Sequence, residues 1–490
     1  MPVLKLWQNN RSAQIPFDKG QSLRELLVRC GYETDHPCGG RGSCGKCRIQ
    51  ITGNISEPTA AEAAAGFRLS CQITLLGDAE VRLNDTLLPN VELSGDIPSL
   101  GNAMGGSYGA AVDIGTTTIA TKLYDLRTGT LLAEAGMLNP QCSVAADVMG
   151  RIGAAIEGHL ANLQDMLLSA IHSLLEQVCI TGNISTDQIG STVIAGNTTM
   201  LYLLTGRDPK CLSRAPFQAD CLFGFEDNIL GIPAYYPPCM NAFVGADITC
   251  AVLDSGMTEK SQISLLCDIG TNGELALWKD GKLFVTSTAA GPAFEGAGIS
   301  CGCGSIPGAI DQVWLDDGKI CIHTIGEKEA IGLCGSGLVD TISVFLEQEA
   351  IDETGYMEED SLPLSKTVAL LPADIRAVQL AKGAIAAGIR TLLEEAQISH
   401  KEIETLYIAG GFGSHLNVSS AAAIGLIPKD LAHKVRILGN SALSGAAKIL
   451  LNRQKMVQVK EIADRAYHVN LGGNSRFNQH FMDAMLFGDE

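Results

Sequence analysis

Three cysteines lie within ten positions of one another near the N-terminus, in the stretch HPCGGRGSCGKCR (36–48). Cys38, Cys44 and Cys47 have the spacing C-x5-C-x2-C, and Cys71 follows after 23 intervening residues. Thiolates a few residues apart can reach adjacent corners of one small inorganic core, and a distant fourth thiolate closes the site. The pattern therefore predicts four ligands of a [2Fe–2S] cluster, which transfers one electron at a time.

The rest of this loop fits a cluster better than the alternative, a structural zinc ion. Its glycines let the chain wrap tightly and bring N–H groups to the sulfur atoms. They are Gly39, Gly40, Gly42 and Gly45. C-x2-C is also a zinc spacing, but zinc sites usually pair two short units, whereas here three cysteines share one loop. Cys30 is expected to be a buried residue at the end of a helix, with no ligand role.

A second group of residues forms a repeated turn after an apolar strand. AAVDIGTTT (110–118) and SLLCDIGTNGE (264–274) each place an aspartate, Asp113 or Asp268, at a strand end before Ile-Gly-Thr. Each aspartate can hold a magnesium ion through water and act on the attacking water, while the turn donates hydrogen bonds to phosphate. The predicted phosphate-binding residues are Gly115, Thr116, Thr117, Thr118, Gly270, Thr271, Asn272 and Gly273. The sequence has no G-x4-G-K-[ST] motif, so it is not a P-loop protein.

Further glycine-rich turns follow apolar strands. In YIAGGFGSHLN (407–417), Gly410, Gly411 and Phe412 are predicted to border an adenine or ribose. In IGLCGSGLVD (331–340), Gly335 and Ser336 either face phosphate or ribose at a helix start, or form a turn without a ligand.

The sequence does not decide the roles of two polar residues and one long loop. Asn197 and Asp247 end apolar strands, and either line the cleft or cap helices. The loop AAGPAFEGAGISCGCGSIPG (289–308), with Cys301 and Cys303, is interpreted as structural, because two further metal ligands are missing nearby.

These residues require two kinds of architecture to position them. The first hundred residues are β-rich, with a helix over SLRELLVRC (22–30) and strands at 46–52 and 81–88. Beyond a Gly- and Ser-rich linker, helices predicted at roughly 160–178 and at 377–396 alternate with strands. The duplicated DIGT segments, 155 positions apart, predict two similar lobes across a cleft. The predicted domains are 1–95, a linker at 96–108, a first lobe at 109–262 and a second lobe at 263–490.

Composition restricts the partners. The formal net charge is −19, and residues 1–98 carry 10 Lys/Arg against 11 Asp/Glu, so nearly all the negative charge lies in the body. Nucleic-acid binding needs a basic face and is therefore not expected. There is no apolar run of membrane-spanning length and no signal peptide, and the 16 cysteines indicate reduced thiols or metal ligation. We expect a cytoplasmic protein.

Two resemblances follow from these motifs. The cluster loop resembles plant- and adrenodoxin-type [2Fe–2S] ferredoxins, which implies an α+β ferredoxin-like β-grasp domain over residues 1–95. The DIGTTT, CDIGTNGE and AGGFG segments resemble the acetate and sugar kinase, Hsp70 and actin superfamily. That resemblance implies an α/β, two-lobed, ribonuclease-H-like ATPase that binds ATP and Mg²⁺ over residues 109–490.

The whole arrangement resembles the reductive activators of corrinoid proteins. The family implies ATP-dependent return of Co(II) to Co(I) on a corrinoid protein of a methyltransferase system, with an external low-potential electron donor. This chain is shorter than the longer members of the family, which leaves its inter-domain geometry open. Whether the chain forms a homodimer is also left open. The corrinoid motif D-x-H-x-x-G is absent from the sequence, so the corrinoid is expected on a partner. The alternatives are an activator ATPase of another low-potential metalloenzyme and a small-molecule kinase with a redox-sensing cluster.

Overall fold

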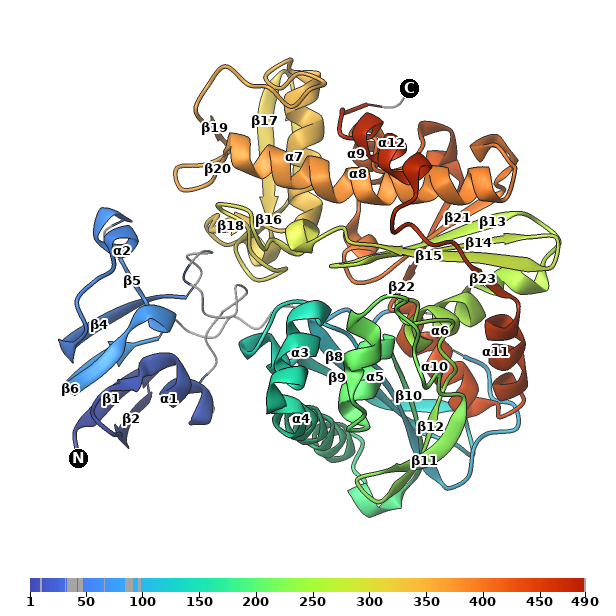
Figure 1. Cartoon of the computed structure of the whole chain (residues 1–490), viewed down its shortest axis with the longest axis horizontal. Helices are drawn as coiled ribbons and strands as arrows, with labels where there is room; N and C mark the ends of the chain where they lie inside the picture. Colours follow the sequence, from blue (N-terminus) through green and yellow to red (C-terminus); the bar gives the residue numbers. More distant parts are fainter. Residues whose placement is uncertain are drawn as a thin grey trace. The chain divides into compact units, whose positions relative to one another are not determined.

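The computed structural model describes residues 1–8, 11–30, 32, 42, 47–65, 67–83, 91–95 and 98–488. They divide into two compact units (Figure 1). One comprises Met1–Leu88 with Pro140–His159, and the other comprises Pro89–Asn139 with Leu160–Glu490.

The first unit is built on a mixed β-sheet of order β2-β1-β6-β4-β5, with β3 against β6. β1 (Val3–Gln8) runs parallel to β6 (Thr74–Arg82), and its other neighbour β2 (Arg11–Pro16) is antiparallel. The remaining elements are β3 (Gln21–Ser22), α1 (Leu23–Arg29), β4 (Arg48–Ile55), α2 (Ala60–Ala65), β5 (Arg68–Leu69) and the 3-10 turn η1 (Ser70–Gln72). This is the β-grasp arrangement predicted from the sequence.

The core of this sheet follows the sequence pattern. Leu4 and Leu6 alternate on β1, and Leu23, Leu26 and Leu27 share one face of α1; all are buried in one cluster. The helix predicted at 22–30 is confirmed. Of the strand predicted at 81–88, residues 81–82 form the end of β6, which begins at Thr74, and residues 84–88 lie outside the described residues. Gly77 and Asp78 have the composition of a turn, yet they continue the strand.

The segment Pro140–His159 belongs to the first unit. It contains the 3-10 turn η2 (Pro140–Ser143), α3 (Val148–Ala154) and the π-turn η3 (Ala155–His159). The Arg24 guanidinium of α1 donates a hydrogen bond to the Ser143 carbonyl. Arg151 is fully buried and donates to the Ala145 carbonyl at 3.0 Å, which fixes the turn before α3.

The second unit holds two six-stranded sheets of related topology. Their orders are β11-β12-β10-β7-β8-β9 and β22-β21-β13-β14-β15-β23. In each, an antiparallel meander (β7-β8-β9 or β13-β14-β15) has a parallel neighbour beside its first strand. This shared order is the duplication predicted from the two DIGT segments.

The strands of these sheets have the following bounds. The first contains β7 (Tyr108–Ile114), β8 (Thr118–Asp125), β9 (Thr130–Leu138), β10 (Ile189–Gly196), β11 (Phe225–Ile229) and β12 (Ile232–Tyr236). The second contains β13 (Ser264–Ile269), β14 (Gly273–Lys279), β15 (Lys282–Thr288), β21 (Thr405–Ala409), β22 (Val435–Gly439) and β23 (Ala466–His468). Smaller sheets contain β16 (Ala309–Asp316), β17 (Lys319–Thr324), β18 (Gly332–Leu333), β19 (Leu362–Pro363) and β20 (Ala369–Leu370).

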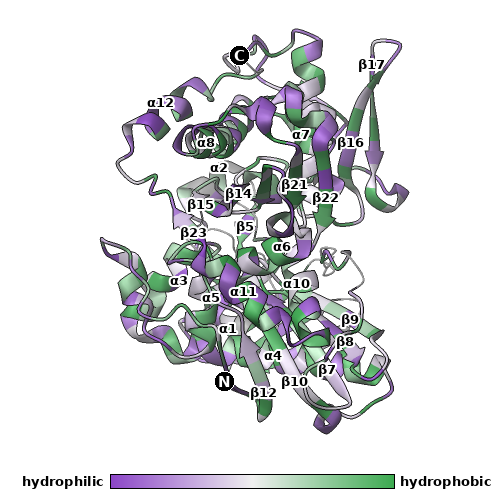
Figure 2. Cartoon of the chain, turned by 90° about the vertical axis from the view of Figure 1, so that its right-hand side faces the viewer, coloured by the Kyte–Doolittle hydropathy of each residue, from purple (hydrophilic) through white to green (hydrophobic). Residues whose placement is uncertain are grey.

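The α-helices of this unit cover and join the sheets. They are α4 (Leu160–Thr181), α5 (Thr198–Leu204), α6 (Ala246–Ser255), α7 (Gly335–Glu347), α8 (Pro372–Glu395), α9 (Val418–Ala423), α10 (Ser441–Leu451), α11 (Lys455–Asp464) and α12 (Ser475–Asp483). α4 and α8 confirm the two predicted helices. α8, seen nearly end-on in Figure 2, begins five residues earlier than predicted, with Pro372 in its first turn. No described helix combines the length and the hydropathy needed to cross a bilayer.

The two sheets of the second unit share one hydrophobic core. Residues of α6 and α10 pack in the same cluster as Val193 of the first sheet and Leu266 of the second. A side chain at Gly445 of α10 would lie 2.1 Å from the Cys250 carbonyl of α6, so only glycine permits this helix crossing. The sheets are therefore held together by this helix pair, which orients the ends of β7 and β13.

Candidate functional site

Two of the four predicted cluster ligands lie side by side in the first unit. Cys47 directly precedes β4 and Cys71 lies in η1, and their Sγ atoms are 3.3 Å apart. The Ser70 N–H donates to the Cys47 carbonyl at 2.8 Å, which joins the two segments. Cys38 and Cys44 lie outside the described residues, as do Gly39, Gly40 and Gly45.

The chemistry of this pair fits a metal centre. Cys47 is only 4% exposed, and burial, with a contribution from Cys71, raises the pKa of its thiol to about 12. Such a thiol becomes a thiolate when a metal replaces its proton. No group of three or more His, Cys, Asp or Glu residues gathers as a metal site within the part of the chain that the structure describes. The complete ligand set therefore stays a prediction.

Cys30 differs from expectation. It follows the last residue of α1 and is exposed, whereas the sequence led us to expect a buried side chain. The apolar face of α1 is completed by Leu23, Leu26 and Leu27, which leaves the helix end free to face solvent.

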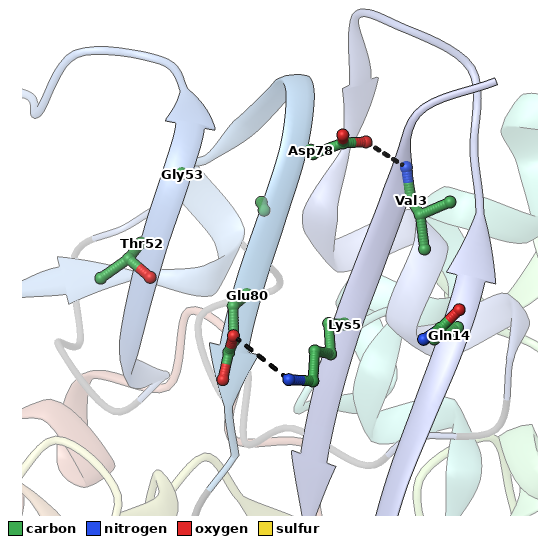
Figure 3. A pocket seen from close by; sticks show the side chains of 8 residues that line it. Val3, Lys5, Gln14, Thr52, Gly53, Asp78 and Glu80 are labelled. Carbon is green, nitrogen blue, oxygen red and sulfur yellow. Dashed lines mark hydrogen bonds and ion pairs between the residues drawn. The ribbon is translucent and has the colours of Figure 1, made fainter.

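A hollow of about 440 Å³ lies on the β-sheet of the first unit, and no predicted ligand is among the residues that line it (Figure 3). The ion pair Lys5–Glu80 crosses it, and Asp78 accepts a hydrogen bond from the Val3 N–H. Its lining carries one cation, Lys5, against the two carboxylates Asp78 and Glu80, and none of the lining residues was predicted to do chemistry.

In the second unit, four carboxylates converge at the ends of β7 and β13. Asp113 and Asp268 end these strands, Asp247 lies in the first turn of α6, and Glu274 lies on β14. Burial raises the pKa of each of the three aspartates to about 7, and repulsion from another of the three contributes in every case. Burial also raises the pKa of Glu274, with repulsion from Asp247 and Asp268. These four carboxylates do not form a direct ligand cage among the described residues. A divalent cation held through water would still relieve their repulsion, which is the manner of Mg²⁺ binding predicted for Asp113 and Asp268.

Asn440 orients the first of these carboxylates. It caps α10 by accepting from the Leu443 N–H, and its Nδ2 donates to Asp113 Oδ2 at 3.1 Å. The same Nδ2 donates to the Glu92 carbonyl. Sequence reasoning missed Asn440. Its signal was the pattern strand-Gly-Asn-Ser at 435–441, which parallels strand-Gly-Asn-Thr at 189–198.

The first phosphate loop is a tight turn between β7 and β8. The Gly115 N–H donates to the Thr118 carbonyl at 2.9 Å, and a side chain on Gly115 would lie 2.8 Å from that oxygen. Thr116 Oγ1 accepts from Asn197 Nδ2 at 3.0 Å. Asn197 also caps α5, so it has both of the roles that the sequence left open. Thr118 already belongs to β8.

The second loop repeats this turn. The Gly270 N–H donates to the Asn272 carbonyl at 3.0 Å, and a side chain on Gly273 would lie 2.7 Å from Thr288 Oγ1. Thr271 presents its N–H and hydroxyl on the same side, since both donate to one carboxylate oxygen.

That carboxylate is Glu295, which sequence reasoning missed. Its Oε1 accepts from Thr271 N–H and Oγ1 at 2.9 and 2.8 Å, and its Oε2 accepts from Thr117 Oγ1 at 2.9 Å. Glu295 therefore joins the two phosphate loops. It is the only acidic residue in the glycine-rich loop 289–308, which was interpreted as purely structural.

The predicted adenosine loop packs against this region. Gly410 has a φ of +88°, and a side chain there would lie 2.5 Å from Asp268 Oδ1. The Phe412 ring stacks on Phe294, with centroids 4.9 Å apart. A side chain on Gly411 would have only the Glu92 Cβ, at 3.3 Å, within contact distance.

The turn at Gly335 and Ser336 is packed inside the protein. A side chain on Gly335 would meet the Phe294 carbonyl at 1.9 Å. Ser336 is buried, and its hydroxyl donates to the Asp311 carbonyl at 2.9 Å. The geometry accounts for both residues through packing at the start of α7, and a ligand role for them stays a prediction.

The fold and these sites define a class: an iron–sulfur domain of ferredoxin type joined to a nucleotide-binding body of the actin, hexokinase and Hsp70 (ASKHA) fold. Family models match three consecutive stretches of the chain. Residues 8–76 match the 2Fe-2S iron-sulfur cluster binding domain, 108–260 the RACo middle region, and 262–490 the C-terminal ASKHA domain of RACo.

Individual proteins agree with these models. The chain is 35% identical over 420 residues to the corrinoid activation enzyme RamQ of Eubacterium limosum, covering 78% of this chain and 70% of that protein. It is 27% identical over 423 residues to the [Co(II) methylated amine-specific corrinoid protein] reductase of Methanosarcina barkeri, covering 78% and 77%. A solved reductive activator for corrinoid, iron-sulfur protein aligns with a TM-score of 0.71 at 27% identity, covering 99% and 98%. The chain belongs to the RACo family of reductive activators of corrinoid proteins.

Proposed function

We propose that this protein uses ATP to drive one electron from its [2Fe–2S] centre onto the Co(II) of a corrinoid held by a partner protein, regenerating Co(I) for methyl transfer. One observation carries this proposal. The same chain contains a pair of adjacent cysteines in a ferredoxin-type unit and a duplicated turn with buried aspartates in its second unit. Membership of the RACo family supports it.

The need for ATP follows from the direction of electron transfer. For one electron, every 59 mV uphill lowers the equilibrium constant tenfold. Nucleotide binding and hydrolysis can offset such a gap only by acting differently on two states of the complex. A nucleotide site is therefore expected in an activator and has no purpose in a simple ferredoxin.

The corrinoid is placed on a partner because this sequence has no D-x-H-x-x-G motif. The proposed partner is a corrinoid protein of a methyltransferase system. An external low-potential donor supplies the electron to the cluster.

The residues of the second unit have distinct roles in this proposal. Asp113 and Asp268 would hold Mg²⁺ through water and direct the attacking water, and Asn440 keeps Asp113 in place. The backbone and hydroxyl groups of the two DIGT turns would bind phosphate oxygens. When bound, Mg²⁺ would neutralise phosphate charge, and the cluster on Cys38, Cys44, Cys47 and Cys71 would store the transferred electron.

The decisive experiment uses the holoprotein with a Co(II) corrinoid protein under anoxic conditions. Co(I) absorption is expected only when ATP and a low-potential reductant are both present. ADP in place of ATP is the matched control. Co(I) that forms equally well with ADP would overturn the proposal.

A further inference from the structure

Glu295 uses the same donors that a terminal phosphate would need. Its two carboxylate oxygens accept from different loops, Oε1 from Thr271 and Oε2 from Thr117. Two oxygens of a phosphate group bridging the loops would take the same N–H and hydroxyl groups. These donors have a limited number of hydrogens, so a carboxylate and a phosphate cannot both occupy them.

The loop around Glu295 is fixed at several points. The Gly291 N–H donates to the Thr271 carbonyl at 2.9 Å, and the Phe294 ring stacks on Phe412 of the predicted adenosine loop. Gly296 has a φ of +76°, and a side chain there would lie 2.2 Å from the Cys303 carbonyl. The backbone therefore aims the carboxylate between the phosphate loops, and only the flexible Glu295 side chain is free to swing away.

Electrostatic repulsion favours replacement of the Glu295 carboxylate by phosphate over binding of both anions at the same donors. Asp113, Asp247 and Asp268 already repel one another at the ends of the strands that lead into these loops, and a nucleoside triphosphate adds further negative charge. Charge-assisted hydrogen bonds from Thr117 and Thr271 stabilise whichever anion holds them.

We propose that Glu295 competes with the γ-phosphate for Thr117 and Thr271, and so determines how the site distinguishes ATP from ADP. A nucleoside triphosphate must displace the carboxylate. A diphosphate, which lacks the γ-phosphate, leaves it in place. After hydrolysis, Glu295 retakes the two threonines and promotes release of inorganic phosphate. This inference rests on the nucleotide site of the proposed function.

The test compares Glu295→Gln and Glu295→Ala with wild type by titration calorimetry of the full holoprotein. Glutamine retains the shape and loses the charge, whereas alanine loses the bridge. Both variants are expected to bind a non-hydrolysable ATP analogue about tenfold more tightly, with ADP affinity unchanged within about twofold. Glu358→Gln, an exposed glutamate outside every helix and strand, is the matched control and should change neither affinity.

Other outcomes would overturn the inference. A lower kcat of ATP hydrolysis with unchanged affinity for the analogue would make Glu295 a catalytic base. A parallel change in ADP and analogue affinity would make it a structural support of the loop. Because calorimetry needs no corrinoid protein, failure here is separate from failure of the proposed function. Wild-type protein that binds no nucleotide would refute both.

Discussion

At the scale of single residues, both sites place side by side groups that repel one another once they are ionised. The first unit places two sulfur atoms 3.3 Å apart, and a shared proton or a common metal ion would stabilise this pair once a thiol ionises. The second unit gathers carboxylates whose repulsion a divalent cation relieves. In both, we expect a positive centre supplied from outside the chain to stabilise the ionised side chains.

Replacing Cys71 by alanine tests whether the cysteine pair of the first unit binds the cluster. Cys71→Ala removes one of two adjacent sulfurs, so the visible absorption of a [2Fe–2S] cluster should fall to background. Nucleotide affinity should remain within about twofold of wild type, because Cys71 belongs to the other compact unit. Cys30→Ala is the control, since Cys30 is exposed and is not a predicted ligand. A cluster that persists in Cys71→Ala would refute the ligand assignment.

The carboxylate cluster makes stability depend on pH and magnesium together. An aspartate has a pKa of about 3.9 in an unfolded chain and about 7 at Asp113, Asp247 and Asp268 in the folded protein. The folded state therefore binds more protons, and its stability should decrease as pH rises from about 4 to about 7. Magnesium needs the ionised form, so it should raise Tm by several degrees at about pH 8 and by much less at about pH 6.

Thermal unfolding with and without magnesium, at matched ionic strength, measures this. Asp268→Ala should lose most of the magnesium-dependent increase in Tm and should abolish ATP-dependent Co(II) reduction, with the cluster spectrum intact. Asp360→Ala, at an exposed position, is the control. An equal magnesium effect at both pH values would contradict a cation site on these carboxylates.

At the scale of elements, glycine turns bring backbone within reach of the carboxylates. Gly410 combines a positive φ with a close approach to Asp268, so two demands coincide at one residue. Gly281, in the turn between β14 and β15, has a similar φ of +80° with no atom within 4 Å of an added Cβ. Comparing substitutions at Gly410 and Gly281 therefore separates the effect of backbone strain, present at both, from the effect of crowding against Asp268, present only at Gly410.

Both Gly410→Ala and Gly281→Ala should lower the free energy of unfolding by about 1–2 kcal/mol, the cost of a left-handed conformation for alanine. Only Gly410→Ala should also weaken nucleotide binding, by about tenfold or more, because its Cβ would displace Asp268. Denaturant unfolding and calorimetry give the two quantities. Equal nucleotide affinity in the two variants would show that Gly410 does not shape the site.

Whether a feature could be predicted from the sequence depends on how far apart its interacting residues lie in the chain. The DIGT turns, α1, α4 and α8 follow local patterns and were found from sequence. Glu295 and Asn440 were not, because each acquires its role from residues more than 20 positions away. The start of β6 was predicted seven residues too late, because Gly77 and Asp78 look like a turn in isolation. The cluster loop at 33–41 and 43–46 lies outside the described residues, so sequence remains the source for Cys38 and Cys44.

At the scale of the whole molecule, two chemistries are joined in one chain: electron delivery and nucleotide hydrolysis. They can be useful to each other only if they are coupled through the partner. If ATP changes the affinity for the Co(II) corrinoid protein, that protein must change the affinity for ATP by the same factor. Couplings of this kind commonly correspond to about 5- to 150-fold.

We therefore expect a Co(II) corrinoid protein to tighten ATP-analogue binding about 5-fold or more, and to accelerate ATP hydrolysis. The methylated corrinoid protein needs no activation and serves as the control, with no effect on either. The Cys71→Ala variant separates binding from electron transfer. This variant should form no Co(I), because it lacks the cluster, yet the Co(II) partner should still tighten the variant's binding of the ATP analogue. Calorimetry and phosphate release measure the two effects. If Cys71→Ala lost the response, the coupling would run through the cluster's redox state and not through recognition of the partner.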